Sequence, residues 1–479
     1  MKKIFLFLII FIINFNIYGI DIKSFINYTR INDLESDRNK IYCATNNGII
    51  FYNKSRENFE FFADKKSNLA GQNIYSIIYN QNSDELFLFS DEGVYLKHLS
   101  SYWDKIYNSV GKVNKYYLME DQTYFKNIQG DIYIYKRGNF YPERNNVSMD
   151  IEFKNIHNVN YRFPKNSYKM NDRVDVFESE KINNYKYIVA TKKGFLLIYD
   201  RMRGQYQINH GSIFDRKIAN VFSSKNAVYF LGEYINIYKD NKFNFLKIDE
   251  LKGNINDIAT NKNTSFYIAT KSNGLYLWDN SLKRAYMKKD GLLSNNIKKV
   301  LNENGYIITL SRYGATIINK YNGNKKNLKD FKYYNLDNIS YENNYLAMHK
   351  KDKVIIYNMK KETAIEISAV DLYNDVITDV FIKNNIVYVG GNSALSKYSI
   401  YDQTIENIKS FNSSINDIFI NGEYIYVGSN RGLYLYNFKE EIVKLYDEFE
   451  GLSSNIVKKV FVFDGKIFVK TDKGLDIIE

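Results

Sequence analysis

Short apolar segments alternate with polar turns along most of this chain. In residues 267–279, an apolar segment is followed by a polar turn that ends at Gly274 and by a second apolar segment. The same order returns in residues 42–52, 187–200, 424–437 and 468–478. Apolar runs of this length, bounded by turn residues, are typical of β-strands. A short glycine turn between two such runs predicts an antiparallel pair.

The turn glycines repeat with a period near 40 residues. Gly274 and Gly314 are 40 residues apart, and Gly432 and Gly474 are 42 residues apart. One complete unit holds four predicted strands, at residues 255–259, 265–270, 275–279 and 283–287. Helical repeats of similar length would place apolar residues three and four positions apart over longer stretches, a pattern that this chain lacks. We therefore predict an all-β fold, a β-propeller built from four-stranded blades.

The number of units predicts two rings. Eleven units are recognisable, and the 64 residues between Gly130 and Gly194 hold either a degenerate twelfth blade or an insertion. One ring usually has roughly four to eight blades. We therefore expect two tandem propellers, in residues 20–250 and 251–479, with one large ring or a partly open array as the alternative.

The ends of the repeat region predict how a ring closes. The last unit stops after its third strand, at residues 475–479, and a spare apolar segment occupies residues 24–29. Pairing of these two segments would complete the final blade and cover an unpaired strand edge.

The loop sequences resemble a known repeat. Residues 451–475 run as Gly-Leu-Ser-Ser-Asn, an apolar strand, and then Thr-Asp-Lys-Gly-Leu, and the same loop returns at residues 290–296. This pattern resembles the two-component-regulator propeller repeat, although this chain has Tyr or Phe where the family often has Trp. The resemblance implies a ligand-binding sensor propeller. Such propellers often form the sensory part of membrane histidine kinases, but we expect no kinase segment in this chain.

The N-terminus predicts export. Residues 1–19 combine a basic start, a short apolar run and a terminal Gly19, which is typical of a signal peptide; an uncleaved membrane anchor is the alternative. We therefore expect the protein in the periplasm, in the cell envelope or outside the cell. Cys43 is the only cysteine, so no internal disulfide can form, and we expect a buried apolar thiol.

The net charge is +12, but basic residues are interleaved with acidic ones. This pattern favours a solvated basic surface over a nucleic-acid stripe. We expect a protein or glycan partner, no nucleic acid, and a peripheral contact with membrane or envelope. Anionic glycans and lipid head groups are candidates.

One face of the propeller is predicted to carry the binding loops. In a four-stranded meander, the loop into the first strand and the turn between the second and third strands lie on the same face. Their polar residues would surround the mouth of the channel, and the candidate binding residues are Ser294, Asn295, Arg312, Tyr313, Arg431, Ser454 and Asn455. The alternative is that such residues only shape turns, because Gly, Asn and Ser are common turn formers.

A second set of polar residues occupies the third position of the predicted first strands. These residues are Asp33, Ser76, Asp175, Asn220, Asp257, Lys299, Asn338, Asp379, Asp417 and Lys459. Carboxylates around an axis could bind a cation, or they could hydrogen-bond backbone groups of the neighbouring blade. The interspersed lysines favour the second interpretation.

Catalytic signals are weak. The four histidines are scattered, with His349 expected in a solvated or capping role near a strand end, and no nucleophile elbow or phosphate-binding loop occurs. We therefore predict no catalytic residues, no metal and no cofactor. The leading hypothesis is an exported, non-enzymatic binding, sensor or scaffold protein. The alternatives are a polysaccharide-active hydrolase or lyase and a surface adhesin or envelope assembly factor.

Overall fold

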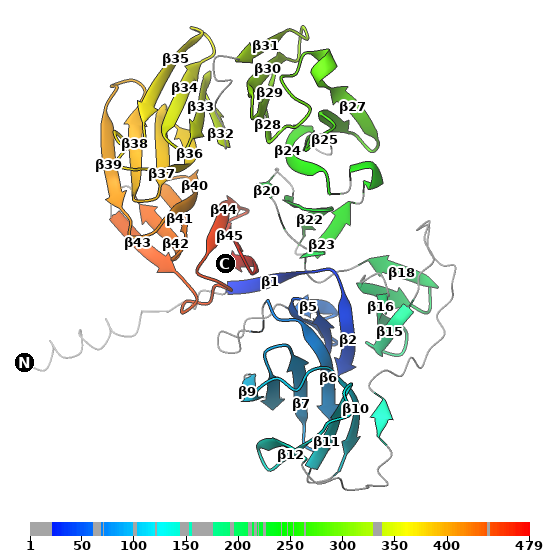
Figure 1. The fold of residues 1–479 in the computed structure, drawn as a ribbon. Helices are drawn as coiled ribbons and strands as arrows, with labels where there is room; N and C mark the ends of the chain where they lie inside the picture. The colour runs from blue at the N-terminus through cyan, green and yellow to red at the C-terminus, as the bar shows by residue number, and fades with distance from the viewer. Residues whose placement is uncertain are drawn as a thin grey trace, which may run out of the picture.

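The protein folds almost entirely into antiparallel β-sheets (Figure 1). The computed structural model describes residues 22–60, 69, 71–98, 103–119, 122–143, 153–155, 176–191, 196–208, 213–214, 218, 220–223, 227–240, 242–246, 248–251, 253–262, 265–328, 338–437 and 441–479. In these residues there are eleven sheets and two short 3-10 helices, η1 (Asp249–Leu251) and η2 (Lys288–Asp290). The predicted fold class, tandem β-propellers with four-stranded blades, is confirmed. The predicted signal peptide, residues 1–19, lies outside the described residues.

The C-terminal propeller contains seven sheets. The first four are built from β20 (Asn220–Ser223), β21 (Val228–Leu231), β22 (Ile235–Lys239) and β23 (Lys242–Leu246); β24 (Ile255–Lys262), β25 (Ser265–Thr270), β26 (Leu275–Trp278) and β27 (Leu282–Tyr286); β28 (Lys299–Glu303), β29 (Tyr306–Ser311), β30 (Gly314–Asn319) and β31 (Lys325–Leu328); and β32 (Asn338–Glu342), β33 (Tyr345–Lys350), β34 (Lys353–Asn358) and β35 (Thr363–Ser368). The other three are built from β36 (Ile377–Lys383), β37 (Ile386–Gly391), β38 (Ala394–Ser399) and β39 (Ile405–Ser410); β40 (Ile415–Asn421), β41 (Tyr424–Ser429), β42 (Gly432–Asn437) and β43 (Glu441–Tyr446); and β44 (Val457–Phe463), β45 (Lys466–Thr471), β46 (Gly474–Ile478) and β1 (Ile22–Tyr28).

The first strand of each sheet lies on the inside of this ring. β20, β24, β28, β32, β36, β40 and β44 contact one another in this order, and β44 contacts β20, so the ring is closed. Second strands such as β25 and β29 are buried because they are central in their own sheet and face sheets on both sides. The core therefore consists of layers between sheets; one layer packs Ile308, Ile317, Met348 and Ile355 together.

The seventh sheet joins the two ends of the repeat region. β1 pairs antiparallel with β46, with Ile22 opposite Ile478 and Phe25 opposite Leu475. Residues 24–28 of the segment expected at the closing edge thus lie in β1. β1 also pairs in parallel with β19 (Ile213–Phe214), which leads back into the C-terminal ring.

The N-terminal propeller contributes four sheets to the described part of the chain. They are built from β2 (Ile31–Ser36), β3 (Lys40–Thr45), β4 (Gly48–Asn53) and β5 (Asn58–Glu60); β6 (Ile74–Asn80), β7 (Glu85–Ser90), β8 (Val94–His98) and β9 (Asp104–Tyr107); β10 (Val113–Leu118), β11 (Gln122–Asn127), β12 (Ile132–Lys136), β13 (Asn139–Pro142) and β14 (Lys154–Asn155); and β15 (Val176–Lys181), β16 (Lys186–Thr191), β17 (Leu196–Asp200) and β18 (Gln205–Ile208). β2 contacts both β6 and β15. Cys43 is fully buried in β3, as predicted. Most of the irregular segment 141–172 lies outside the described residues.

The packing bears on where one propeller ends and the next begins. The sequence placed the division between residues 250 and 251. In the structure, Phe230 of β21 shares a core with Phe468 and Leu475, and the rings of Tyr238 and Phe468 are 5.6 Å apart. The sheet β20–β23 thus packs against the last sheet of the C-terminal ring, and we propose a division near residue 210. The N-terminal propeller then forms an insertion between the closing strand β1 and the rest of the C-terminal ring.

None of the helical segments in the described part of the chain has the length and apolar character that a bilayer crossing requires.

Candidate functional site

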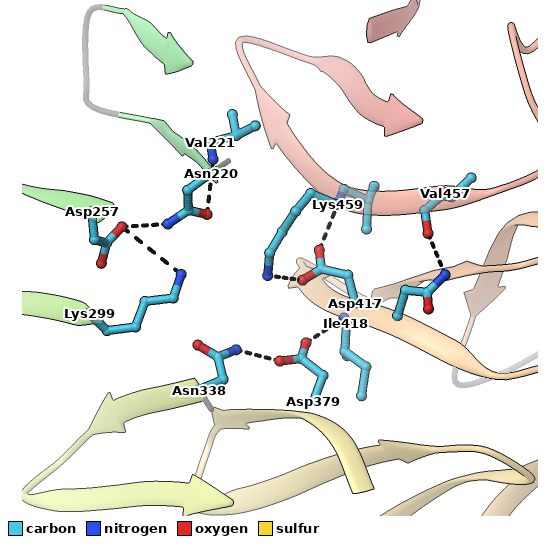
Figure 2. Close-up of polar contacts among 12 residues, drawn as sticks. Asn220, Val221, Asp257, Lys299, Asn338, Asp379, Asp417, Ile418, Val457 and Lys459 are labelled. Atoms are coloured by element: carbon cyan, nitrogen blue, oxygen red, sulfur yellow. Dashed lines mark hydrogen bonds and ion pairs between the residues drawn. The ribbon is translucent and has the colours of Figure 1, made fainter. Parts of the chain in front are cut away.

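The third positions of the inner strands converge on the axis of the C-terminal ring. Figure 2 shows this axial cluster, formed by Asn220, Asp257, Lys299, Asn338, Asp379, Asp417 and Lys459. In β24, β36, β40 and β44 the strand register shifts between the first and third positions, as between Ile255 and Asp257. Such a bulge turns the third side chain away from the regular strand direction. These seven residues belong to the predicted third-position set, which also contains Asp33, Ser76 and Asp175, and the structure brings the seven together.

Each carboxylate of the axial cluster bonds to the next sheet. One oxygen of Asp257 accepts a hydrogen bond from the Val300 backbone N–H at 3.0 Å. The corresponding pairs are Asp379 with the Ile418 N–H and Asp417 with the Val460 N–H, both at 2.8 Å. Among the described strands, the inner strand lies at the edge of its sheet, so these aspartates supply an acceptor to N–H groups at a sheet edge.

The second carboxylate oxygen of each aspartate faces an amide or an ammonium group. The Asn220 amide donates to Asp257 at 2.5 Å, and the Asn338 amide donates to Asp379 (Figure 2). The Lys459 ammonium bonds Asp417, whereas the Lys299 ammonium lies 4.0 Å from Asp257.

Asparagines at the second position make a matching set of bonds. The Asn256 amide donates to the Ile297 carbonyl at 2.8 Å, and the Asn416 amide donates to the Val457 carbonyl at 2.8 Å. Polar side chains therefore cap both the N–H and C=O groups between adjacent inner strands. This favours the interpretation in which the carboxylates hydrogen-bond the neighbouring blade. Within the described ranges, no three His, Cys, Asp or Glu side chains are grouped so as to hold a metal ion.

The two ion pairs of the axial cluster differ in strength. Burial raises the pKa of Asp417 to about 6, and Lys459 limits the rise. Burial opposes the charge of Lys459, but Asp417 and Asp379 together raise its pKa above the ordinary value. The pKa of Asp257 is raised by burial and that of Lys299 is lowered by burial, since their 4.0 Å separation offsets less of the desolvation.

Four of the seven predicted loop residues shape their own turns. The Ser294 and Ser454 hydroxyls accept hydrogen bonds from the backbone N–H two residues on, at 3.0 and 3.1 Å. The Asn295 side chain accepts from the Lys288 N–H at 2.7 Å, and Asn455 accepts from the N–H of Glu448 at 2.8 Å. Their side-chain oxygens thus make the local bonds typical of turn formers.

The other three predicted loop residues lie at exposed turn tips. Arg312 and Tyr313 join β29 to β30, and Arg431 lies between β41 and β42. The Arg312 guanidinium stacks over the Tyr313 ring at 4.5 Å from its centroid and bonds its hydroxyl. Stacking of this kind presents a cation and an aromatic ring as one unit. Two sheets, β32–β35 and β36–β39, separate this turn from Arg431.

Two assignments from sequence need correction or extension. His349 was expected to be solvated or capping, but it is buried within β33, opposite Asn338.

Glu178 was missed by the sequence analysis: its carboxylate accepts from the Leu34 N–H at 2.8 Å, as Asp33 accepts from the Ile77 N–H at 2.7 Å. The third position of β15 is Glu178, because the bulge lies between Val176 and Glu178. Asp175, the residue expected there, is outside the described residues.

Comparisons with known proteins find structural resemblance but no matching sequence family. No protein-family profile matches this chain, and no curated protein matches it. PorZ, a surface component of the type-IX secretion system of Porphyromonas gingivalis, is 14% identical, with 94% of this chain and 73% of that chain covered and a TM-score of 0.47. The extracellular domain of the one-component system BT4673 from B. thetaiotaomicron is 13% identical, with 94% and 75% covered and a TM-score of 0.46. YCF48 bound to D1 peptide is 8% identical, with 55% and 92% covered and a TM-score of 0.46. Likeness at this level assigns no function to this chain.

Proposed function

We propose that this protein is an exported, non-enzymatic binding protein, acting as a sensor or scaffold. It recognises a protein or glycan partner through turn tips on one face of the C-terminal propeller. The observation that supports the proposal is a contrast between the axial carboxylates and the exposed turn residues. The axial carboxylates are engaged in bonds between sheets, whereas Arg312 and Tyr313 form an exposed, stacked pair.

An exposed Arg–Tyr pair suits recognition more than catalysis. The guanidinium can bond a carboxylate or phosphate in a bidentate manner, and the ring can contact apolar or sugar surfaces. Aromatic and arginine side chains are also common anchors in protein interfaces. Arg431, at the equivalent turn of another sheet, would give an extended partner a second contact.

The test is binding of the mature protein to a glycan array and to envelope proteins, with bound proteins identified by mass spectrometry. We expect one reproducible ligand, whose affinity falls at least about tenfold when Arg312 and Tyr313 are both changed to Ala, as for loss of an anchor residue. The matched control is Lys361→Ala. It removes an exposed cation from the turn between β34 and β35, on the opposite edge of the sheets, and should leave binding unchanged.

Equal binding by the Arg312→Ala/Tyr313→Ala variant and the wild type would reject this face as the site. Turnover of a bound glycan would reject the non-enzymatic role.

A further inference from the structure

The N-terminal propeller has a seam that is held by acidic side chains. This seam joins the sheet β2–β5 to the sheet β15–β18, which lie side by side in Figure 1. Each of the two sheets is formed by consecutive strands, so within the described ranges no strand is exchanged across the seam. Across it, Glu178 accepts from the Leu34 N–H at 2.8 Å, and the Ser36 hydroxyl donates to Glu180 at 2.6 Å.

Two carboxyl groups meet directly at the seam. The Leu34 N–H holds the Glu178 carboxylate at 2.8 Å, beside Asp33. Burial raises the pKa of Asp33, and repulsion from Glu178 and a hydrogen bond to its carboxylate raise this pKa further. An ionised carboxylate has acceptors but no donor, so this bond requires that one of the two groups keeps its proton. Asp33 is also bonded to the next sheet, through the Ile77 N–H at 2.7 Å. The proton of Asp33 therefore lies in a chain of contacts that links three sheets.

Among the residues that the structure describes, little positive charge faces this proton. The other acidic groups that act on the pair or on its neighbours are Glu35, Glu180 and Asp37. The Lys54 ammonium donates to the Asp37 carbonyl at 2.7 Å. Burial lowers the pKa of Lys54, and its charge partly offsets the rise in the pKa of Glu180 that burial causes. The hydroxyl of Tyr116 and the thiol of Cys43 also face these acids, and burial raises the pKa of both, so they remain neutral. Lys115 holds the third position of β10, the inner strand that contacts β6.

In the C-terminal ring, an asparagine amide takes the place of the protonated acid at this contact. At the equivalent third positions, the Asn338 amide donates to Asp379, and the Asn220 amide donates to Asp257 at 2.5 Å. An amide donates at any pH, whereas an acid pair donates only while it holds a proton. The two rings thus share a geometry but differ in the group that donates a hydrogen bond to the carboxylate, which is an amide in one ring and a protonated acid in the other.

We propose that the seam between β2–β5 and β15–β18 is a pH-sensitive latch, closed while protonated Asp33 donates to the Glu178 carboxylate and loosened when Asp33 loses its proton. Glu35 of β2 and Glu180 of β15 face each other across the same seam: burial, reinforced by the charge of Glu180, raises the pKa of Glu35, and Glu180 accepts from the Ser36 hydroxyl. Loss of a proton from Glu35 should therefore loosen the seam in the same direction.

The direction of the pH dependence follows from the native pKa values. Burial, reinforced by Glu178, raises the pKa of Asp33 well above its ordinary value, and burial raises the pKa of Glu35 to about 8. The closed seam therefore retains protons that the open seam releases. Its stability is greatest in acid, declines as pH rises from the ordinary carboxyl range toward the native pKa values, and then levels off. For each proton released, the equilibrium constant for opening rises by up to about tenfold per pH unit.

The experiment is amide hydrogen exchange of the intact protein between pH 5.5 and 8, corrected for the intrinsic pH dependence of exchange. We expect the protection of peptides from β2 and β15 to fall by roughly tenfold per pH unit. Peptides from β32 and β36 in the same sample should change much less, since the Asn338 amide donates to Asp379 there. Asp33→Asn keeps an acceptor for the Ile77 N–H and a donor for Glu178, so it should flatten the pH dependence. Glu178→Gln should do the same and serves if the first variant does not fold.

A reciprocal variant tests the mechanism in the other ring. Asn338→Asp places an acid pair with Asp379 and should give β32 and β36 a pH dependence that the wild type lacks there. The latch is rejected if protection of β2 and β15 in the wild type does not depend on pH in this range. It is also rejected if Asp33→Asn and Glu178→Gln keep the full wild-type dependence.

Discussion

At the scale of single residues, the axis of the C-terminal ring is held by side chains that replace missing strand partners. Asp257, Asp379 and Asp417 each accept a backbone N–H from the following sheet. Asn256 and Asn416 each donate to a backbone carbonyl of the following sheet. A buried carboxylate is stable only when it is bonded or paired, so the neighbours of each aspartate decide how much it contributes.

Loss of the Lys459 ammonium should destabilise the C-terminal ring. Lys459→Met leaves Asp417 buried without its cation, and breaking a buried pair costs about 3–5 kcal/mol. The free energy of unfolding should fall by that order in denaturant titrations at pH 7. The pKa of Asp417, already raised to about 6, should rise further, so part of the stability should return as the pH is lowered toward 5.

The matched control for this variant is Lys458→Met, which changes the exposed neighbouring residue. It should alter the free energy of unfolding by no more than about 0.5 kcal/mol. Equal effects of the two substitutions would show that the axial ion pair is not a structural contact.

At the scale of elements, the glycine turn between the second and third strands fixes how the fourth strand packs. Gly314 has a φ of 118°, and a Cβ atom there would lie 2.3 Å from the Leu328 carbonyl oxygen of β31. Gly432 has the same φ, and its Cβ would lie 2.3 Å from the Tyr446 carbonyl oxygen of β43. The repeated glycine of the sequence is therefore required by both the backbone conformation and the close approach of the fourth strand.

Gly314→Ala should destabilise the protein more than an alanine substitution at a glycine where only the positive φ is unfavourable. Gly323 also has a positive φ, 72°, but no atom lies within 4 Å of a Cβ built there. Gly323→Ala should cost about 1–2 kcal/mol, and Gly314→Ala should cost more, because the Leu328 carbonyl must move. Thermal unfolding of the two variants measures the difference; equal losses would contradict the packing argument.

At the scale of the whole molecule, the C-terminal ring is closed by a strand from the other end of the chain. β1 covers the edge of β46, and the parallel pairing of β1 with β19 brings both connections between the propellers side by side. Closure of the ring and insertion of the N-terminal propeller are therefore the same topological feature.

Removal of residues 22–28 should open the C-terminal ring. The edge of β46 loses its pairing partner, and an exposed strand edge promotes association with other chains. We expect lost hydrogen-exchange protection in β44–β46 first, a lower melting temperature and a tendency to aggregate. A synthetic peptide of residues 22–28, added in trans, should restore protection in β46, whereas a scrambled peptide should not. Unchanged protection in the truncated protein would refute closure by β1.

The sequence determined the repeat, the four-stranded sheets and the candidate residues of the axis and the turns. It did so because strand patterning and glycine turns are local properties, readable from short windows such as residues 267–279. The sequence pattern assigned the third position of this strand to Asp175 instead of Glu178. The bulge between Val176 and Glu178 is defined by pairing with β16, which the local sequence does not reveal.

Only the tertiary structure decided which sheets are neighbours, and this decided the roles of the polar residues. Asp33 and Asp379 occupy the same position in their repeats, but one meets an acid and the other meets an amide. That difference arises from side chains about 40 to 145 positions away in the sequence, which come close only when the rings close.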